Sequence, residues 1–148
     1  MSPKPKFKNN AVKQNNFLIE ELPGLSQDEI DNLKNCGITN TLALIKQGKT
    51  VQEKLLLATK LQVHIQYVNK WVALADLARI PSVGTQYCGL LLHAGVASVM
   101  QLTITPPHRL HKQILRLQVA TLQRRDLCPP VEQVQQWFEQ AKLIHNDS

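Results

Sequence analysis

Apolar side chains recur every three or four residues along most of this chain, which is the spacing of one face of an α-helix. The spacing predicts helices over 28–36, 41–47, 51–61 and 64–77 in the first half, and over 85–94, 98–103, 106–121 and 131–143 in the second. Apolar runs such as Leu55-Leu56-Leu57 lack the turn-flanked alternation of apolar and polar residues that a strand would show. The pattern therefore predicts an all-α fold.

Residues that favour helix ends mark several of these boundaries. Thr105 stands before two prolines, so the pattern predicts that Thr105 caps the helix at 106–121. Gly95 follows a predicted helix at the position where a left-handed residue often ends one. Cys128-Pro129-Pro130 separates the last two helices, because proline cannot continue a helix.

The two halves of the chain repeat one pattern. Leu22-Pro23-Gly24-Leu25-Ser26 aligns with Ile80-Pro81-Ser82-Val83-Gly84 at an offset of 58 residues, and Trp71 aligns with Trp137 at an offset of 66. Further matched pairs are Leu33 with Leu91, Gly37 with Gly95, Leu44 with Leu102 and Val68 with Val134. We therefore expect halves at 16–78 and 79–144 that share one helical plan and pack together, with both tryptophans in the core. A flexible basic tail at 1–15 precedes them, and a short C-terminal end at 145–148 follows.

Each half contains a tight bend with proline and glycine between two helices. This arrangement resembles the helix-hairpin-helix motif. The matched Trp, Ala and Leu positions near the end of each half, together with Ala94-Gly95-Val96, resemble more narrowly an uncharacterised bacterial family, the domain of unknown function numbered 4332, over residues 20–144. The resemblance implies two tandem helix-hairpin-helix (SAM-like) repeats packed as one compact helical bundle. The broader motif also implies sequence-independent contact with DNA phosphates.

The second bend is the first candidate binding site. A tight bend at the start of a helix presents unpaired backbone N–H groups, and the helix dipole adds partial positive charge there. The candidate donors are the backbone amides of Val83, Gly84 and Thr85 and the side chains of Ser82 and Gln86. Because glycine hairpins also serve simply as turns, a structural and a phosphate-binding role both remain open for this bend.

The first bend is followed by three acidic residues, Asp28, Glu29 and Asp31. These residues suit the positive end of a helix dipole but would repel a phosphate. Ser26 also stands where the motif has its second glycine. We interpret the first bend as structural.

The second candidate site is a basic stripe on the predicted helix at 106–121. Its members, Arg109, Lys112 and Arg116, are spaced by three and four residues, so they lie on one helix face. His108, His111, Arg124 and Arg125 add possible donors nearby. The stripe is either a solvated face of an amphipathic helix or a surface that contacts phosphates, with the lysines of the tail as a further contact.

Composition and charge narrow the class of protein. The 148 residues are 43% apolar and 19% charged, which excludes a wholly disordered chain. The formal charge of +6 favours nucleic acid or another anionic surface only modestly. Residues 21–78 hold six lysines and six acidic residues, whereas residues 79–148 hold seven lysines and arginines against four acidic residues. The first half is therefore neutral, and the second half is basic.

Other chemistry has little support in the sequence. Cys36, Cys88 and Cys128 form no C-x-x-C pair, which suggests free thiols in a reducing cytoplasm. His108-x-x-His111 has helical spacing but no neighbouring residue that would complete a set of metal ligands. The chain shows no nucleophile motif, nucleotide-binding motif, secretory signal or membrane-spanning stretch. We expect no enzyme activity, no cofactor, no metal, no membrane association and no small-molecule substrate.

Two functional hypotheses follow from these features. The first is a non-enzymatic module that binds duplex DNA independently of sequence, through the second bend and the basic stripe. The alternative is an adaptor for protein interaction or assembly that uses the same helices as a rigid scaffold, since a fold alone does not fix a function. The sequence favours the first hypothesis only because the helix-hairpin-helix motif implies contact with DNA.

Overall fold

The computed structural model describes residues 13–122 and 128–147, and within them it contains eight α-helices. The first four are α1 (Gln27–Asn35), α2 (Thr41–Gln47), α3 (Val51–Leu61) and α4 (Ile65–Ala78), and a short 3-10 helix, η2 (Ile19–Glu21), precedes α1. The last four are α5 (Gly84–His93), α6 (Val99–Thr103), α7 (Pro107–Leu122) and α8 (Val131–Asp147). The described residues form no strand beyond one isolated bridge between Leu18 and Asn40. The predicted all-α class is confirmed.

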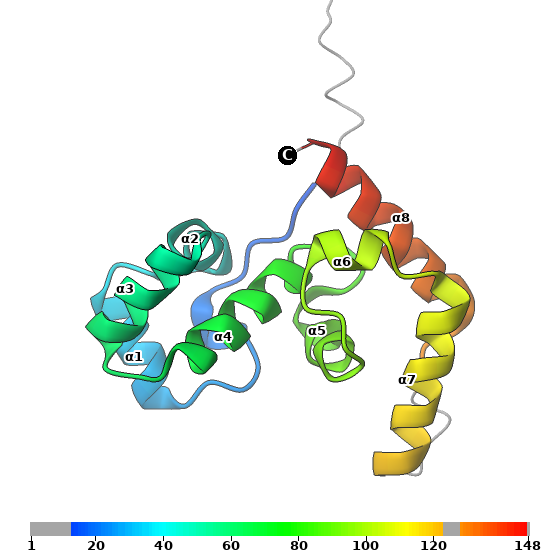
Figure 1. Ribbon diagram of the computed structural model, residues 1–148, viewed down its shortest axis with the longest axis horizontal. Coiled ribbons are helices and arrows are strands. Elements are labelled where there is room, and N and C mark those ends of the chain that lie inside the picture. Colours follow the sequence, from blue (N-terminus) through cyan, green and yellow to red (C-terminus); the bar gives the residue numbers. More distant parts are fainter. Residues whose placement is uncertain (1–12, 123–127, 148) are drawn as a thin grey trace, which may run out of the picture.

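α4 and α8 organise the packing of the helices. α2 and α3 pack against α4, and α6 and α7 pack against α8 in the same way (Figure 1). α5 joins the two groups by packing against α4. The buried apolar residues form one cluster that includes Trp71 on α4 and Trp137 on α8, as expected for both tryptophans. The molecule is therefore one compact helical bundle.

Matched residues begin and end matched helices. Asn40 before α2 and Ser98 before α6 each accept a hydrogen bond from the backbone N–H three residues later, which satisfies one free donor of the helix start. Gly37 after α1 and Gly95 after α5 have φ angles of +84° and +96°, a conformation that costs glycine little. Equivalent local chemistry thus fixes equivalent helix boundaries.

Two predicted boundaries need correction. Thr105 does not cap α7, because its hydroxyl donates to the carbonyl of Gln101 at 2.8 Å. Pro106 holds the position before the helix instead, and its carbonyl accepts from the N–H of Leu110 at 3.0 Å. α8 continues beyond the predicted end at residue 143, because the buried Ile144 extends its apolar face.

Gln14 and Asn15, which the predicted tail at 1–15 includes, both make hydrogen bonds with Arg79. Gln14 accepts a hydrogen bond from Arg79 at 3.1 Å, and the backbone N–H of Asn15 donates to the Arg79 carbonyl at 3.0 Å. The reason is that carbonyls at the end of α4 have no partner within the helix and need donors from elsewhere. Residues 1–12 lie outside the described residues.

Replacing one buried leucine in each half tests whether the bundle unfolds as one unit. Leu44→Ala and Leu102→Ala remove matched side chains that are fully buried, so each should lower the free energy of unfolding by about 2–5 kcal/mol. Urea denaturation followed by circular dichroism should show a single transition for both variants. Leu56→Ala, at a position that is 70% exposed, is the control and should change the stability by less than about 0.5 kcal/mol. Two separate transitions would contradict a single cooperative core.

Candidate functional site

The polar groups of the second bend form hydrogen bonds with α8 and with the carbonyl of Ile80 beside the bend. The backbone N–H of Ser82 donates to Oε1 of Gln140 at 2.9 Å, and Nε2 of Gln140 donates to the hydroxyl of Ser82 at 2.9 Å. The backbone amides of Val83 and Gly84 both donate to the carbonyl of Ile80, at 3.0 and 3.1 Å. Val83 and Gly84 are buried. Three consecutive amides of the bend therefore already have acceptors.

The segment before η2 covers the bend from another side. Nδ2 of Asn15 lies 3.2–3.3 Å from the carbonyls of Ala78, Ile80 and Pro81, all within hydrogen-bond distance. A Cβ atom added to Gly84, whose φ is +52°, would lie 3.4 Å from the ring of Phe17. The bend is thus enclosed by the N-terminal segment as well as by α8.

The expectation of open phosphate donors at this bend is wrong for the backbone amides of Val83 and Gly84, and the Ser82 hydroxyl already accepts from Gln140. The physical reason is burial: a backbone N–H inside the bundle must find an acceptor within the protein. Ser82, in place of a glycine, also supplies the hydroxyl that Gln140 binds. Thr85 is half-buried and Gln86 is exposed, and both lie in the first turn of α5. They are the candidate residues of this bend that stay accessible, without the other three.

Sequence reasoning missed Gln140, which lies 58 residues beyond its partner. The available signal was its place next to Ala141, on the apolar side of the last predicted helix. A polar residue at the border of a buried face is often there to satisfy a buried polar group. Nothing in the local sequence names Ser82 as that group.

The first bend has a structural role, as expected. Ser26 accepts a hydrogen bond from the N–H of Glu29 at 3.2 Å, and the carboxylate of Glu29 accepts one from the N–H of Ser26 at 2.8 Å. This reciprocal pair is a capping box, which satisfies two donors at the start of α1. Gly24, with a φ of +86°, makes the turn that precedes it.

The basic stripe lies on α7 with all three members exposed. Arg109, Lys112 and Arg116 share one face, and α7 contains no acidic residue between Pro107 and Leu122. Among the described residues the ion pairs are Lys34 with Glu20 and Arg79 with Asp76, so no described carboxylate neutralises the stripe. The predicted neighbours Arg124 and Arg125 lie outside the described residues.

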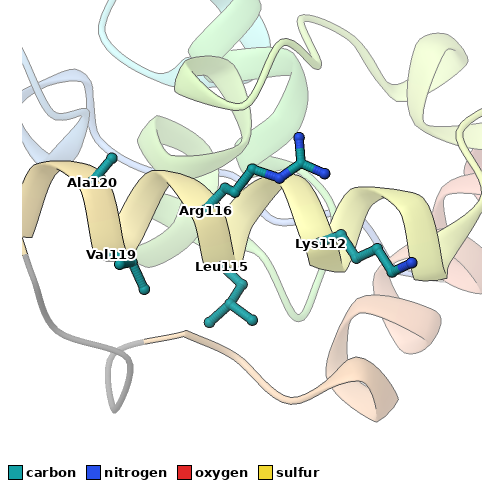
Figure 2. A pocket seen from close by; sticks show the side chains of 5 residues that line it. All are labelled: Lys112, Leu115, Arg116, Val119 and Ala120. Carbon is teal, nitrogen blue, oxygen red and sulfur yellow. The ribbon is translucent and has the colours of Figure 1, made fainter.

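An apolar hollow adjoins the basic stripe on α7. It has a volume of about 570 Å³ and is lined by Lys112, Leu115, Arg116, Val119 and Ala120. Figure 2 shows Leu115 and Val119 on one side of the helix, while the side chains of Lys112 and Arg116 extend along it towards its start. Val119 is 41% exposed. Apolar and cationic side chains therefore share one accessible surface, which we call the α7 surface.

α7 is attached to the bundle mainly by its opposite side. Leu110 and Ile114 are fully buried, and α7 packs against α8. In Figure 1 the end of α7 extends away from the other helices. Helical spacing places Leu115 and Val119 on a different side of α7 from Leu110 and Ile114. Because Leu110 and Ile114 are the residues buried in the bundle, Leu115 and Val119 remain accessible.

The cysteines and histidines form no larger cluster in the described part of the chain. Sγ of Cys128 lies 3.8 Å from Nε2 of His111, and burial raises the pKa of the Cys128 thiol. Cys88 is buried, and Cys36 and Cys128 are half-buried. No group of three or more His, Cys, Asp or Glu residues able to hold a metal occurs among the described residues. The Cys128–His111 contact joins two residues that the sequence places 17 apart.

Residues 23–144 match a family model described as a domain of unknown function, DUF4332. The chain belongs to the DUF4332 family. The predicted resemblance to this family is thus confirmed, and the matched region of this DUF4332 protein runs from the first bend into α8. Comparisons with curated proteins and with solved structures gave no match. No described helix of the DUF4332 chain has both the length and the apolar character needed to cross a membrane.

Replacing Gln140 tests how strongly α8 holds the second bend. Gln140→Leu keeps the size of the side chain but leaves the N–H and hydroxyl of Ser82 without these partners, so the free energy of unfolding should fall by about 1–3 kcal/mol. Gln136→Leu, at an exposed position of the same helix, is the matched control and should change it by less than about 0.5 kcal/mol. Chemical denaturation of both variants measures the difference. Equal stability of the two variants would show that the contact with Ser82 contributes nothing.

The Cys88 thiol predicts a loss of stability at high pH. Burial raises its pKa from 9.0 to about 11, so between these values the unfolded chain has lost a proton that the folded chain still binds. The contribution of the Cys88 thiol to the free energy of unfolding should therefore be fully present below pH 9. It should fall by about 1.4 kcal/mol per pH unit from there up to about pH 11. Urea denaturation of the wild type and of Cys88→Ala at several pH values isolates this effect, because other groups titrate in both. Parallel curves for the two proteins would contradict it.

Proposed function

We propose that this chain is a non-enzymatic adaptor whose α7 surface binds an acidic amphipathic helix of a partner protein. The observation that carries the proposal is the shared surface of α7, where half-buried Leu115 and exposed Val119 adjoin the cations Lys112 and Arg116. Partner helices commonly dock by placing apolar side chains spaced by three or four residues into such a surface.

The apolar part of the surface supports a protein partner. Leu115 and Val119 are four residues apart, so they lie one turn apart on the same side of α7. A hollow of about 570 Å³ can take one or two apolar side chains, and their burial is favourable because it removes apolar area from water. A phosphate backbone has no comparable apolar groups to place there.

The cations of the α7 surface favour a partner helix with negative charge. Lys112 and Arg116 line the apolar hollow and also a neighbouring hollow that contains Arg109, so the cations border the apolar side chains along the helix. Since no described carboxylate neutralises them, glutamates or aspartates beside the apolar residues of a partner helix would gain attraction and correct register.

Duplex DNA is the competing partner of the same helix. The exposed basic stripe of Arg109, Lys112 and Arg116 favours it, but at the second bend, which was to supply backbone donors to phosphates, the amides of Ser82, Val83 and Gly84 are bound within the protein. A DNA site on this chain would therefore rest on side-chain cations alone. Such a site would be weak and strongly dependent on salt.

Peptide selection distinguishes the two partners. A phage-displayed library of helical peptides as long as α7, 16 residues, is selected on the intact chain and counter-selected on the variant Leu115→Ser/Val119→Ser. We expect enrichment of peptides with apolar residues at helical spacing flanked by acidic residues. Their affinity, measured by fluorescence anisotropy, should fall at least about tenfold in the double serine variant and also in Arg109→Glu/Lys112→Glu/Arg116→Glu.

Matched variants and a duplex control complete the test. Leu56→Ser on α3 and the triple variant Lys46→Glu/Lys60→Glu/Lys70→Glu alter exposed residues elsewhere and should leave peptide affinity unchanged. A labelled DNA duplex is measured in parallel at several salt concentrations. The adaptor proposal is overturned if no peptide depends on Leu115 and Val119, or if the duplex binds tightly through the stripe while the serine variant has no effect.

A further inference from the structure

A hollow of about 390 Å³ lies where helices of the first half meet the start of α6. Its lining includes the loop after α2, one side of α3 and α4, and residues 97–98 before α6. Three cations contribute to it: Lys49, Lys54 and Arg79. We propose that this hollow binds a small organic phosphate of about nucleotide size, a site independent of the α7 surface.

Arg79 is held at this hollow by its hydrogen bonds, and Lys49 is brought there by the path of the loop after α2. Arg79 donates from Nε to Asp76 at 2.8 Å and from Nη1 to Gln14 at 3.1 Å, and its side chain is only 17% exposed. A Cβ at Gly48 would lie 2.7 Å from Cγ2 of Val72, so only glycine lets the loop approach α4 this closely. That close approach brings the neighbouring Lys49 to the hollow.

The positive charge of the hollow is not balanced by the carboxylate beside it. Asp76 is the acidic residue in the lining, and both of its oxygens accept hydrogen bonds, from Arg79 and from the backbone N–H of Val99 at 2.8 Å. Its charge is therefore matched by the guanidinium. Lys49 and Lys54 form no ion pair with a described acidic residue. An anion bound at this hollow would gain attraction from both lysines.

The rest of the lining points to an organic phosphate and not a bare ion. Ile45, Val72 and Ala73 supply apolar contacts, and Asn69 supplies an amide that can donate or accept. The volume lies within the range of small-molecule sites, about 300–1,000 Å³. Lysine and arginine are the side chains that bind phosphate best, by charge-assisted hydrogen bonds. A phosphate at the lysines with its organic group on the apolar residues would use every part of the hollow.

Isothermal titration calorimetry on the full chain tests the site. The probes are inorganic phosphate, pyrophosphate, AMP, ADP and adenosine, with no metal added. We expect saturable binding of AMP and ADP, weaker binding of the inorganic ions and none of adenosine. Because the hollow joins elements from both halves, bound AMP or ADP should also raise the midpoint of thermal unfolding.

Matched lysine variants assign the binding to this hollow. Lys49→Gln and Lys54→Gln should each lower the affinity for AMP and ADP at least about tenfold. Lys60→Gln, on the same helix as Lys54 but outside the hollow, should leave the affinity unchanged. The inference is overturned if AMP and ADP show no saturable binding up to about 10 mM. Equal loss in Lys60→Gln, or adenosine binding as well as AMP, would overturn it too. Peptide binding at α7 is measured separately, so failure here leaves that proposal intact.

Discussion

The bundle depends on satisfying the backbone of the bend between α4 and α5. This bend connects the two helix groups, and it is buried, so each N–H and C=O in it needs a partner inside the protein. Asn15 satisfies carbonyls from one side and Gln140 satisfies Ser82 from the other. The partners come from opposite ends of the chain, 63–66 residues before the bend and 58 residues after it. One buried turn thereby fixes the N-terminal segment and the last helix to the same place.

That constraint decides where binding chemistry is possible. Donors already bound within the protein cannot serve a phosphate without breaking those bonds, at a cost of about 1–3 kcal/mol for each buried group left unpaired. The first bend is occupied as well, by the capping box of Ser26 and Glu29. Binding capacity therefore moves from the backbone of the bends to side chains on helix surfaces. α7 offers such a surface, because its contact with the described part of the bundle is mainly with α8.

The fold was largely predictable because its signals are local. Helical periodicity, the caps Asn40 and Ser98, and the glycines Gly37 and Gly95 at helix ends all act within a few residues, and Gly95 ends its helix as predicted. The stripe of Arg109, Lys112 and Arg116 was predictable for the same reason, since helical spacing alone places it on one face. That the polar groups of the second bend are already hydrogen-bonded was not predictable, because their partners, Asn15 and Gln140, are distant in sequence. Local patterns specify elements, whereas tertiary contacts specify which groups stay free.

The net charge of the first half also does not show how its charges are arranged in space. Six lysines and six acidic residues sum to zero over residues 21–78, yet four of those acidic residues lie between Glu21 and Asp31, and five of the lysines lie between Lys46 and Lys70. At physiological salt, charges separated by more than about 8 Å are largely screened from one another, so a charge summed along the chain does not describe the charge at one place on the surface. The acidic side chains at the start of α1 are also committed to their helix end. A segment with no net charge can therefore hold a positive hollow, and only the arrangement in space reveals it.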